Sequence, residues 1–136
     1  MEAGTYPVRA VGRVESSLER REDAPMQGAE GAPDAWIVFF EDVREAAHDL
    51  SVGDDVLVLT WLHQADRDVQ VVHPRDDLSL PEHGVFSTRS SDRPNPIGLH
   101  RVEVREVDDL RIRVRPLEAI DGTPVVDVKP VLRGEA

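Results

Sequence analysis

The residues of this chain that are best suited to binding an anion or a polar ring lie between Gly84 and Gly98, in the segment GVFSTRSSDRPNPIG. Arg89 and Arg93 flank two serines and an aspartate. Guanidinium groups bind carboxylates and phosphates through paired hydrogen bonds, and hydroxyl groups add further donors and acceptors. The segment therefore predicts a binding site for a carboxylate, a phosphate or a polar heterocycle.

Two prolines make the end of this segment rigid. Pro94 and Pro96 bracket Asn95, and each proline restricts its own φ and the conformation of the residue before it. A loop that is rigid before a ligand arrives loses less entropy on binding. The alternative interpretation is structural: Asp92 and Arg93 form a surface ion pair, and the prolines end strands.

Charge is distributed unevenly along the 136 residues, whose formal net charge is −11. Residues 1–83 hold 18 acidic residues and 7 lysines or arginines, whereas residues 84–136 hold 9 of each. An excess of negative charge argues against binding nucleic acid by bulk attraction, because phosphate contacts need cationic surface. We therefore expect any anionic ligand to bind in the second part of the chain.

The size and composition predict one domain over residues 1–136, with residues 133–136 as a short tail. The chain has no cysteine, which excludes disulfides, thiolate metal sites and cysteine nucleophiles. No apolar run approaches the roughly 18 residues that span a bilayer, and the first residues do not read as a secretory signal. We expect a cytoplasmic protein that does not enter a membrane.

Alternation of apolar and polar residues predicts a β protein. It is clearest around Asp108-Asp109, where two alternating runs form a predicted hairpin. Strands are expected at Tyr6–Val14, Ala35–Phe40, Asp55–His63, Val69–Val72, 102–107, 110–115 and Val125–Val128. This pattern favours an all-β barrel or sandwich of six or seven strands, with long functional loops and at most one short helix.

Three local features add detail to this prediction. Asp42–Leu50 predicts a helix of about two turns with Asp42 as its N-cap. Ala35–Phe40 (AWIVFF) is apolar throughout, which is typical of a strand buried on both faces. Glu15–Pro33 is expected to be a long loop, and loops of this length are often functional.

Two segments resemble the signature of the TsaA-like (TrmO) methyltransferase family. They are GVFSTRSSDRPNPIGL, from Gly84, and LEAIDGTPVVDVKPV, from Leu117. The first half of the chain matches the family more weakly, through the segments Ala24–Gln27 and Trp61–Gln64. The resemblance extends over about residues 7–132 and implies a small β-barrel with S-adenosyl-L-methionine as cofactor. It also implies a homodimer with the cofactor near the subunit interface.

The resemblance also implies which residues form the site. Cofactor contacts fall on Pro25, Met26, Gln27, His63, Gln64, Arg89, Leu99, Asp121, Gly122 and Thr123. The acceptor substrate is assigned to Arg93, Asn95 and Lys129, and no catalytic residue is identified.

The chemistry of the cofactor suggests a role for several of these residues. Arg89 could bind its carboxylate through two hydrogen bonds, and Asp121 could accept from its ribose hydroxyls or its ammonium. Gln27 and the backbone of Gly122 and Thr123 could recognise adenine, and Leu99 could cover the face of the ring.

Three functions remain open. The first is N-methylation of the N6-threonylcarbamoyl-modified adenosine next to the tRNA anticodon. The second is methylation of a small molecule, and the third is a non-catalytic module that binds S-adenosyl-L-methionine. Departures from the family pattern at Ser91, His100 and Val131 leave the acceptor undecided.

Some charged residues have a structural interpretation as well. Asp127 and Lys129 lie two apart on a predicted strand and can form an ion pair. Arg111, Arg113 and Arg115 form a basic stripe that could contact RNA, but acidic residues on the neighbouring strand favour a solvated, neutralised face. The five histidines show no short metal-ligand spacing, so we expect no metal site.

Overall fold

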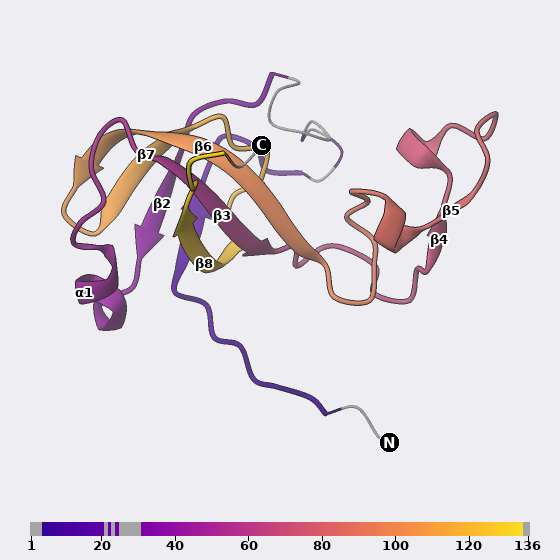
Figure 1. Cartoon of the computed structure of the whole chain (residues 1–136), viewed down its shortest axis with the longest axis horizontal. Coiled ribbons are helices and arrows are strands. Elements are labelled where there is room, and N and C mark those ends of the chain that lie inside the picture. The colour runs from indigo at the N-terminus through magenta and orange to yellow at the C-terminus, as the bar shows by residue number, and fades with distance from the viewer. Residues whose placement is uncertain (1–3, 21, 23, 25–30, 135–136) are drawn as a thin grey trace.

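The computed structural model describes residues 4–20, 22, 24 and 31–134. Six antiparallel strands form a closed barrel in the order β1-β2-β7-β6-β3-β8 (Figure 1). They are β1 (Gly12–Glu15), β2 (Ala35–Phe39), β3 (Asp55–Trp61), β6 (Ile97–Asp108), β7 (Arg111–Arg115) and β8 (Pro124–Pro130). The predicted all-β barrel is confirmed.

The remaining elements are short. β4 (Val71–Val72) and β5 (His83–Gly84) pair into a separate two-stranded sheet. The α-helix α1 covers Arg44–Ala47, and single 3₁₀ turns cover Glu41–Val43, Pro74–Asp76 and Val85–Ser87. Within the described residues, no helix is long and apolar enough to cross a membrane.

The interior of the barrel is aliphatic because alternate residues of each strand point inward. On β3, for example, Val56, Val58 and Thr60 are buried while their neighbours are not. The fully buried core side chains include Val14, Ile37, Val58, Val104, Val114, Leu117 and Val125. Burial of these apolar side chains is the main force that holds the strands in register.

The hairpin predicted around Asp108-Asp109 is confirmed. Asp108 pairs with Arg111, so the turn consists of Asp109 and Leu110, and Asp109 has a φ of 51°. Aspartate is among the few residues other than glycine that adopt this conformation readily.

The structure corrects several boundaries. The first strand begins at Gly12 rather than Tyr6, the strand predicted at Asp55–His63 ends at Trp61, and the one predicted at Val69–Val72 begins at Val71. The strands predicted at 102–107 and Val125–Val128 extend over Ile97–Asp108 and Pro124–Pro130, and the helical segment is a 3₁₀ turn followed by four residues of α-helix. Asp42 does not cap this helix, because neither helical segment has a side-chain cap hydrogen bond. Asp42 accepts instead from Arg9 Nη1 at 2.6 Å.

The prediction that Ala35–Phe40 is buried on both faces is wrong. Ala35, Ile37 and Phe39 are buried, whereas Trp36 and Val38 are half-buried on the outside of the barrel. The guanidinium carbon of Arg111 lies 4.2 Å from the centroid of the Trp36 ring. This cation–π contact covers an outward aromatic ring, so an apolar run does not require burial on both faces.

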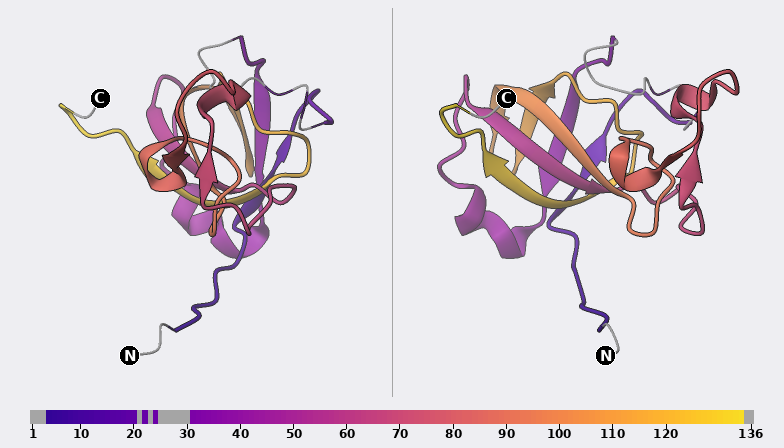
Figure 2. Two further views of the ribbon diagram at one scale, coloured as in Figure 1. Left: turned by 90° about the vertical axis from the view of Figure 1, so that its right-hand side faces the viewer. Right: turned by 45° about the vertical axis from the view of Figure 1, so that its right-hand side comes forward.

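Residues 62–96, between β3 and β6, form an arm that includes β4 and β5. The arm extends away from the barrel, as Figure 1 and the right-hand view of Figure 2 show. The exposed fractions of Phe86 and Leu78 on the arm are 88% and 79%.

Candidate functional site

The barrel brings three connecting segments to one of its ends, which we call the loop end. Residues 16–34 follow β1, residues 62–96 follow β3 and residues 116–123 follow β7. The strand ends that flank them are register partners: Glu15 with Trp36, Ala35 with Val114 and Arg13 with Pro124. Trp61 pairs with Ile97 at the same end. The strand ends from which these segments leave are therefore neighbours at one barrel opening.

The turn Asp121-Gly122-Thr123 lies at the loop end. Gly122 has a φ of 84°, a conformation that favours glycine. Asp121 Oδ1 accepts from the backbone N–H of Ser16 at 3.0 Å, and Asp121 N donates to Leu18 O at 2.6 Å. These bonds join the turn to the segment that follows β1, and they orient the Asp121 carboxylate.

The backbone donors of this turn are already used. Gly122 N donates to Val14 O at 2.8 Å and Thr123 N donates to Ile120 O at 3.2 Å. Thr123 Oγ1 also donates to Ile120 O, at 2.7 Å, and the side chain is buried. The backbone N–H groups of this turn are therefore not free to donate to adenine, which was the role suggested for Gly122 and Thr123.

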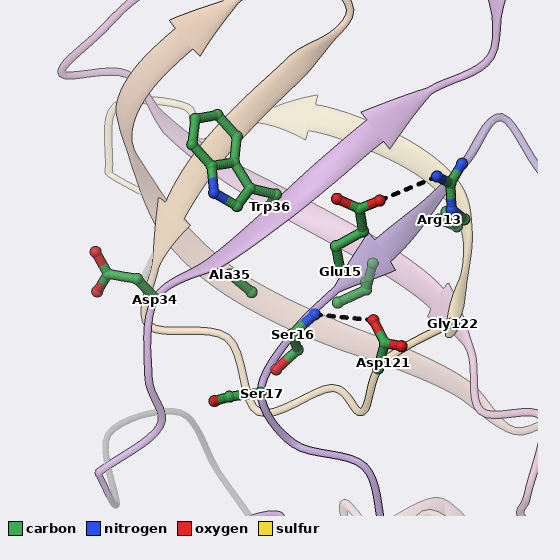
Figure 3. Close-up of a pocket in the computed structure, with 10 residues that line it drawn as sticks. Arg13, Glu15, Ser16, Ser17, Asp34, Ala35, Trp36, Asp121 and Gly122 are labelled. Atoms are coloured by element: carbon green, nitrogen blue, oxygen red, sulfur yellow. Dashed lines mark hydrogen bonds and ion pairs between the residues drawn. The ribbon is translucent and has the colours of Figure 1, made fainter.

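A cleft of about 560 Å³ opens beside the same turn (Figure 3). Its walls come from the end of β1, the start of β2 and the turn. The residues that line it are Arg13, Val14, Glu15, Ser16, Ser17, Asp34, Ala35, Trp36, Asp121 and Gly122. This volume falls in the range of small-molecule binding clefts, and the lining combines an aromatic ring with carboxylates and hydroxyl groups.

The carboxylates of the cleft differ in how they are neutralised. Asp34 binds Arg115 Nε at 2.5 Å and Arg113 Nη1 at 2.6 Å. The hydrogen bond from Arg115, with the one from Arg113, lowers the pKa of the Asp34 carboxyl although desolvation opposes the shift. Glu15 pairs with Arg13 at 3.0 Å. Asp121, by contrast, receives its hydrogen bond from a neutral backbone N–H.

The predicted residues His63 and Gln64 follow the end of β3 after Leu62 and are exposed at the base of the arm. Arg89 lies further along the arm and is also exposed. Within the part of the chain that the structure describes, its guanidinium makes no hydrogen bond or ion pair. A solvated guanidinium that the fold does not use is available to a ligand.

The Pro94-Asn95-Pro96 hook is held by a residue that the sequence analysis missed. Arg67 Nε donates to Pro94 O at 2.8 Å, and Arg67 Nη2 donates to Asn95 Oδ1 at 3.0 Å. The same guanidinium lies 5.1 Å from the centroid of the Trp61 ring. Arg67 thus fixes the hook to the end of β3, so the rigidity predicted from the prolines is reinforced by tertiary contacts.

Arg93 is turned toward the backbone of the arm. Its Nη2 donates to Thr88 O at 2.8 Å and also to Val85 O. Because both carbonyls accept from one guanidinium nitrogen, Arg93 fixes the turn at residues 85–88. Arg89 follows this turn directly. This contact gives Arg93 a structural task, beside the substrate contact proposed for it.

Of the remaining residues predicted from the sequence, two lie on the barrel wall and three lie outside the described residues. Leu99 and Lys129 are exposed on the outside of the barrel, where Leu99 pairs with Leu59 and Lys129 with Leu57. Lys129 Nζ lies 3.3 Å from Asp127 Oδ2, which is the ion pair that the structural interpretation predicted. Pro25, Met26 and Gln27 lie outside the described residues.

The basic stripe on β7 is neutralised, as the structural interpretation predicted. Arg111 pairs with Asp108 at 3.0 Å, Arg113 with Glu106 at 3.2 Å, and Arg115 with Asp34. Among the described residues, no group of three histidine or acidic side chains is arranged to hold a metal ion.

Comparison with known proteins decides the family. Residues 13–134 match the tRNA-methyltransferase O N-terminal domain. The chain belongs to this family. A probable S-adenosyl-L-methionine-binding protein of Methanothermobacter thermautotrophicus is 43% identical to it, over 90% of this chain and 88% of that protein. An S-adenosyl-L-methionine-binding protein of Archaeoglobus fulgidus is 40% identical, over 90% and 86%.

The fold is shared with the tRNA-methyltransferase O structures as well. The crystal structure of TrmO from Pseudomonas aeruginosa superposes with a TM-score of 0.75 at 28% identity. The match covers 96% of this chain and 56% of the TrmO chain. The chain therefore spans a little over half the length of that relative.

Proposed function

We propose that this protein is an S-adenosyl-L-methionine-dependent N-methyltransferase that acts on the N6-threonylcarbamoyl-modified adenosine next to the tRNA anticodon. The observation that carries the proposal is that the chain belongs to the tRNA-methyltransferase O family and that its loop end is where the segments carrying the proposed site residues leave the barrel. His63, Gln64 and Arg89 are on residues 62–96, and the Asp121–Thr123 turn is on residues 116–123. Relatives that are named S-adenosyl-L-methionine-binding proteins support the choice of cofactor.

The described side chains fit the chemical groups of this cofactor. Among the described residues nothing pairs with the Arg89 guanidinium, which we assign to the carboxylate. The Asp121 Oδ1 accepts a backbone hydrogen bond, and its Oδ2, unpaired in the described part of the chain, is assigned to a hydroxyl or an ammonium. Leu99 is 44% exposed and offers apolar surface. When bound, the cofactor supplies a methyl group on a positively charged sulfur.

Methyl transfer to a nitrogen is an in-line displacement, so the protein mainly has to hold two reactants at attack distance. The Arg67-fixed hook serves this task because it is ordered by tertiary contacts. Asn95 uses its Oδ1 to accept from Arg67, and its amide NH₂, which has no partner among the described residues, is assigned to the acceptor. Arg93 and Lys129 are the other residues we assign to the acceptor.

We further propose that the protein acts as a homodimer with the cofactor near the interface. Leu57 and Leu59 of β3 and Ile97 and Leu99 of β6 form an apolar outer face, and the last two are 45% and 44% exposed. An exposed apolar face of this kind marks an interaction site, and Phe86 on the arm is a further exposed apolar side chain. The proposal places the protein in the cytoplasm.

A second candidate is methylation of a small molecule. The neutralised stripe on β7 favours it, because arginines paired with carboxylates release few counterions from a nucleic acid. In this case the cleft beside Asp121 would hold the acceptor, as its volume suits a small ligand.

The deciding experiment is a methylation assay with labelled cofactor. The substrates are tRNA that carries the threonylcarbamoyl modification, the same tRNA without it, and a small-metabolite extract. We expect transfer to modified tRNA and none to unmodified tRNA. Transfer to the extract alone would establish the second candidate. Cofactor binding by calorimetry without any transfer would establish a non-catalytic binding module and overturn the methyltransferase proposal.

A further inference from the structure

Three polar side chains form a buried chain of contacts inside the barrel. Thr60 Oγ1 lies 2.7 Å from His100 Nε2, and His100 Nδ1 contacts Glu118 Oε1. Thr60 is fully buried and His100 is 5% exposed, while the Glu118 side chain is 15% exposed. They come from β3, from β6 and from residues 116–123.

The barrel makes space for this trio. Gly98 is the register partner of Thr60 on the neighbouring strand. A Cβ atom at residue 98 would lie 2.7 Å from His100 Nε2 and still closer to Thr60 Oγ1, so a side chain there would displace the imidazole. A glycine within a strand often marks such a close approach.

The order hydroxyl, imidazole, carboxylate is also that of a nucleophile activated by a histidine. Burial excludes this role here, because a substrate cannot reach a hydroxyl with no exposed surface. The contacts of the trio therefore serve to position the three segments that carry these side chains.

We propose that His100 is a positioning residue that locks together the three segments that carry the cofactor residues. Thr60 is three residues before His63, His100 follows Leu99 directly, and Glu118 is three residues before Asp121. The inference rests on the proposed function and extends it.

The Glu118 contact matters most, because residues 116–123 belong to no strand. This segment is anchored to the barrel by the buried apolar side chains of Leu117, Ala119 and Ile120. Apolar contacts are not directional, whereas hydrogen bonds are. Backbone hydrogen bonds join the Asp121 turn to β1 and to the residues that follow it. The bond between Glu118 and His100 joins the same segment to β6, and through His100 to Thr60 of β3.

The test uses substitutions that preserve shape. Glu118→Gln and Thr60→Val each remove one part of the trio, and Thr60→Ser keeps the hydroxyl. Val102→Ala is the control, because Val102 is a buried residue on the same face of β6 as His100, without a polar partner. S-adenosyl-L-methionine affinity is measured by calorimetry well below each melting temperature, and backbone amide shifts of residues 121–123 are recorded by NMR without cofactor.

We expect Glu118→Gln and Thr60→Val to weaken the affinity at least 5-fold and to shift the amides of residues 121–123. Thr60→Ser should recover most of the loss seen in Thr60→Val. Val102→Ala should lower the melting temperature but change the affinity less than 2-fold.

Two results would overturn the inference, and they can be told apart. If the wild-type protein binds but all variants bind equally well, with unshifted amides, the trio only stabilises the barrel. If the wild-type protein binds no cofactor, the proposed function fails and the inference fails with it.

Discussion

The two ends of the barrel differ in how the chain crosses them. At the loop end the connections are long: residues 16–34, residues 62–96 and residues 116–123. At the opposite end, which we call the hairpin end, Asp109 and Leu110 join β6 to β7, and residues 40–54 pack Val43, Ala47 and Leu50 against the core. One end is thus free to carry a site, while the other closes the core.

The polar interactions show the same division. At the hairpin end, Arg44 is held by both Glu41 and Asp109, and these contacts lower the pKa of both carboxyls. At the loop end, Arg89 and one oxygen of Asp121 are left without partners among the described residues. These charged groups thus belong to the segments that we propose bind the ligand.

The largest expected effect is a loss of stability from a substitution near the hairpin end, without a loss of cofactor affinity at the loop end. Ile112, near the hairpin end, is 2% exposed, and Ile112→Ala should cost about 2–5 kcal/mol of unfolding free energy through the cavity it leaves. Cofactor affinity of the folded protein should stay unchanged. Denaturant unfolding and calorimetry measure the two quantities, and a large loss of affinity would show that the ends are coupled.

The next effect is on binding alone. Arg89→Ala should weaken S-adenosyl-L-methionine binding by about 2 kcal/mol, or roughly 30-fold, because it removes a charged hydrogen-bonding group. The melting temperature should not change, since the described fold makes no use of this guanidinium. Arg105→Ala is the control, because Arg105 pairs with Glu103 on the exposed face of β6. Unchanged affinity in Arg89→Ala would remove Arg89 from the site.

A smaller effect is expected where the arm meets the barrel. Arg67→Ala removes two hydrogen bonds to the hook and the contact with Trp61. We expect a loss of about 1 kcal/mol in cofactor affinity, or roughly 5-fold, from a less ordered hook. Amide hydrogen exchange at residues 94–97 should accelerate while exchange in the barrel core stays the same. Unchanged exchange at the hook would show that the prolines alone order it.

The smallest effect is a pH dependence of stability. The pKa of Asp34 is lowered by its hydrogen bonds to Arg115 and Arg113. Its contribution is therefore present above the ordinary value near 4 and is lost as the pH falls through the lowered pKa. Solvent screening limits it to about 0.5 kcal/mol. The melting temperatures of wild type and Asp34→Asn should differ most above pH 5 and converge in acid.

Asp109→Asn serves as the matched control for this pH dependence. Asparagine tolerates the positive φ of residue 109, and Arg44 keeps its second partner, Glu41. The difference from wild type should be smaller than for Asp34→Asn. If the melting-temperature difference between wild type and Asp34→Asn grew as the pH fell, the predicted direction of the pH dependence would be contradicted.

Much of the barrel was predictable because its signal is local. Alternation of apolar and polar residues along 102–115 reports directly which side chains face inward. The signal for the turn at Asp121-Gly122 is local as well. The ability to adopt a positive φ is a property of glycine itself and does not depend on distant residues.

The contacts that shape the site were less predictable because they join distant residues. Arg67 meets Asn95 across 28 positions, and His100 meets Glu118 across 18 positions. An arginine and a buried histidine have many possible partners in a sequence, and the choice depends on which segments the barrel brings together. Trp36 misled the burial prediction in the same way, because Arg111 covers it from another strand.

Pairing between β1 and β8 closes the ring of strands, and this closure limits how the protein can associate. Where a strand is paired on both sides, it presents no row of unpaired N–H and C=O groups, so another chain cannot extend the sheet there by adding a strand. A partner that docks on side chains or on the loops can assemble and separate without reorganising the barrel's backbone. Amide protection in the barrel strands should accordingly be alike in the free and the bound protein.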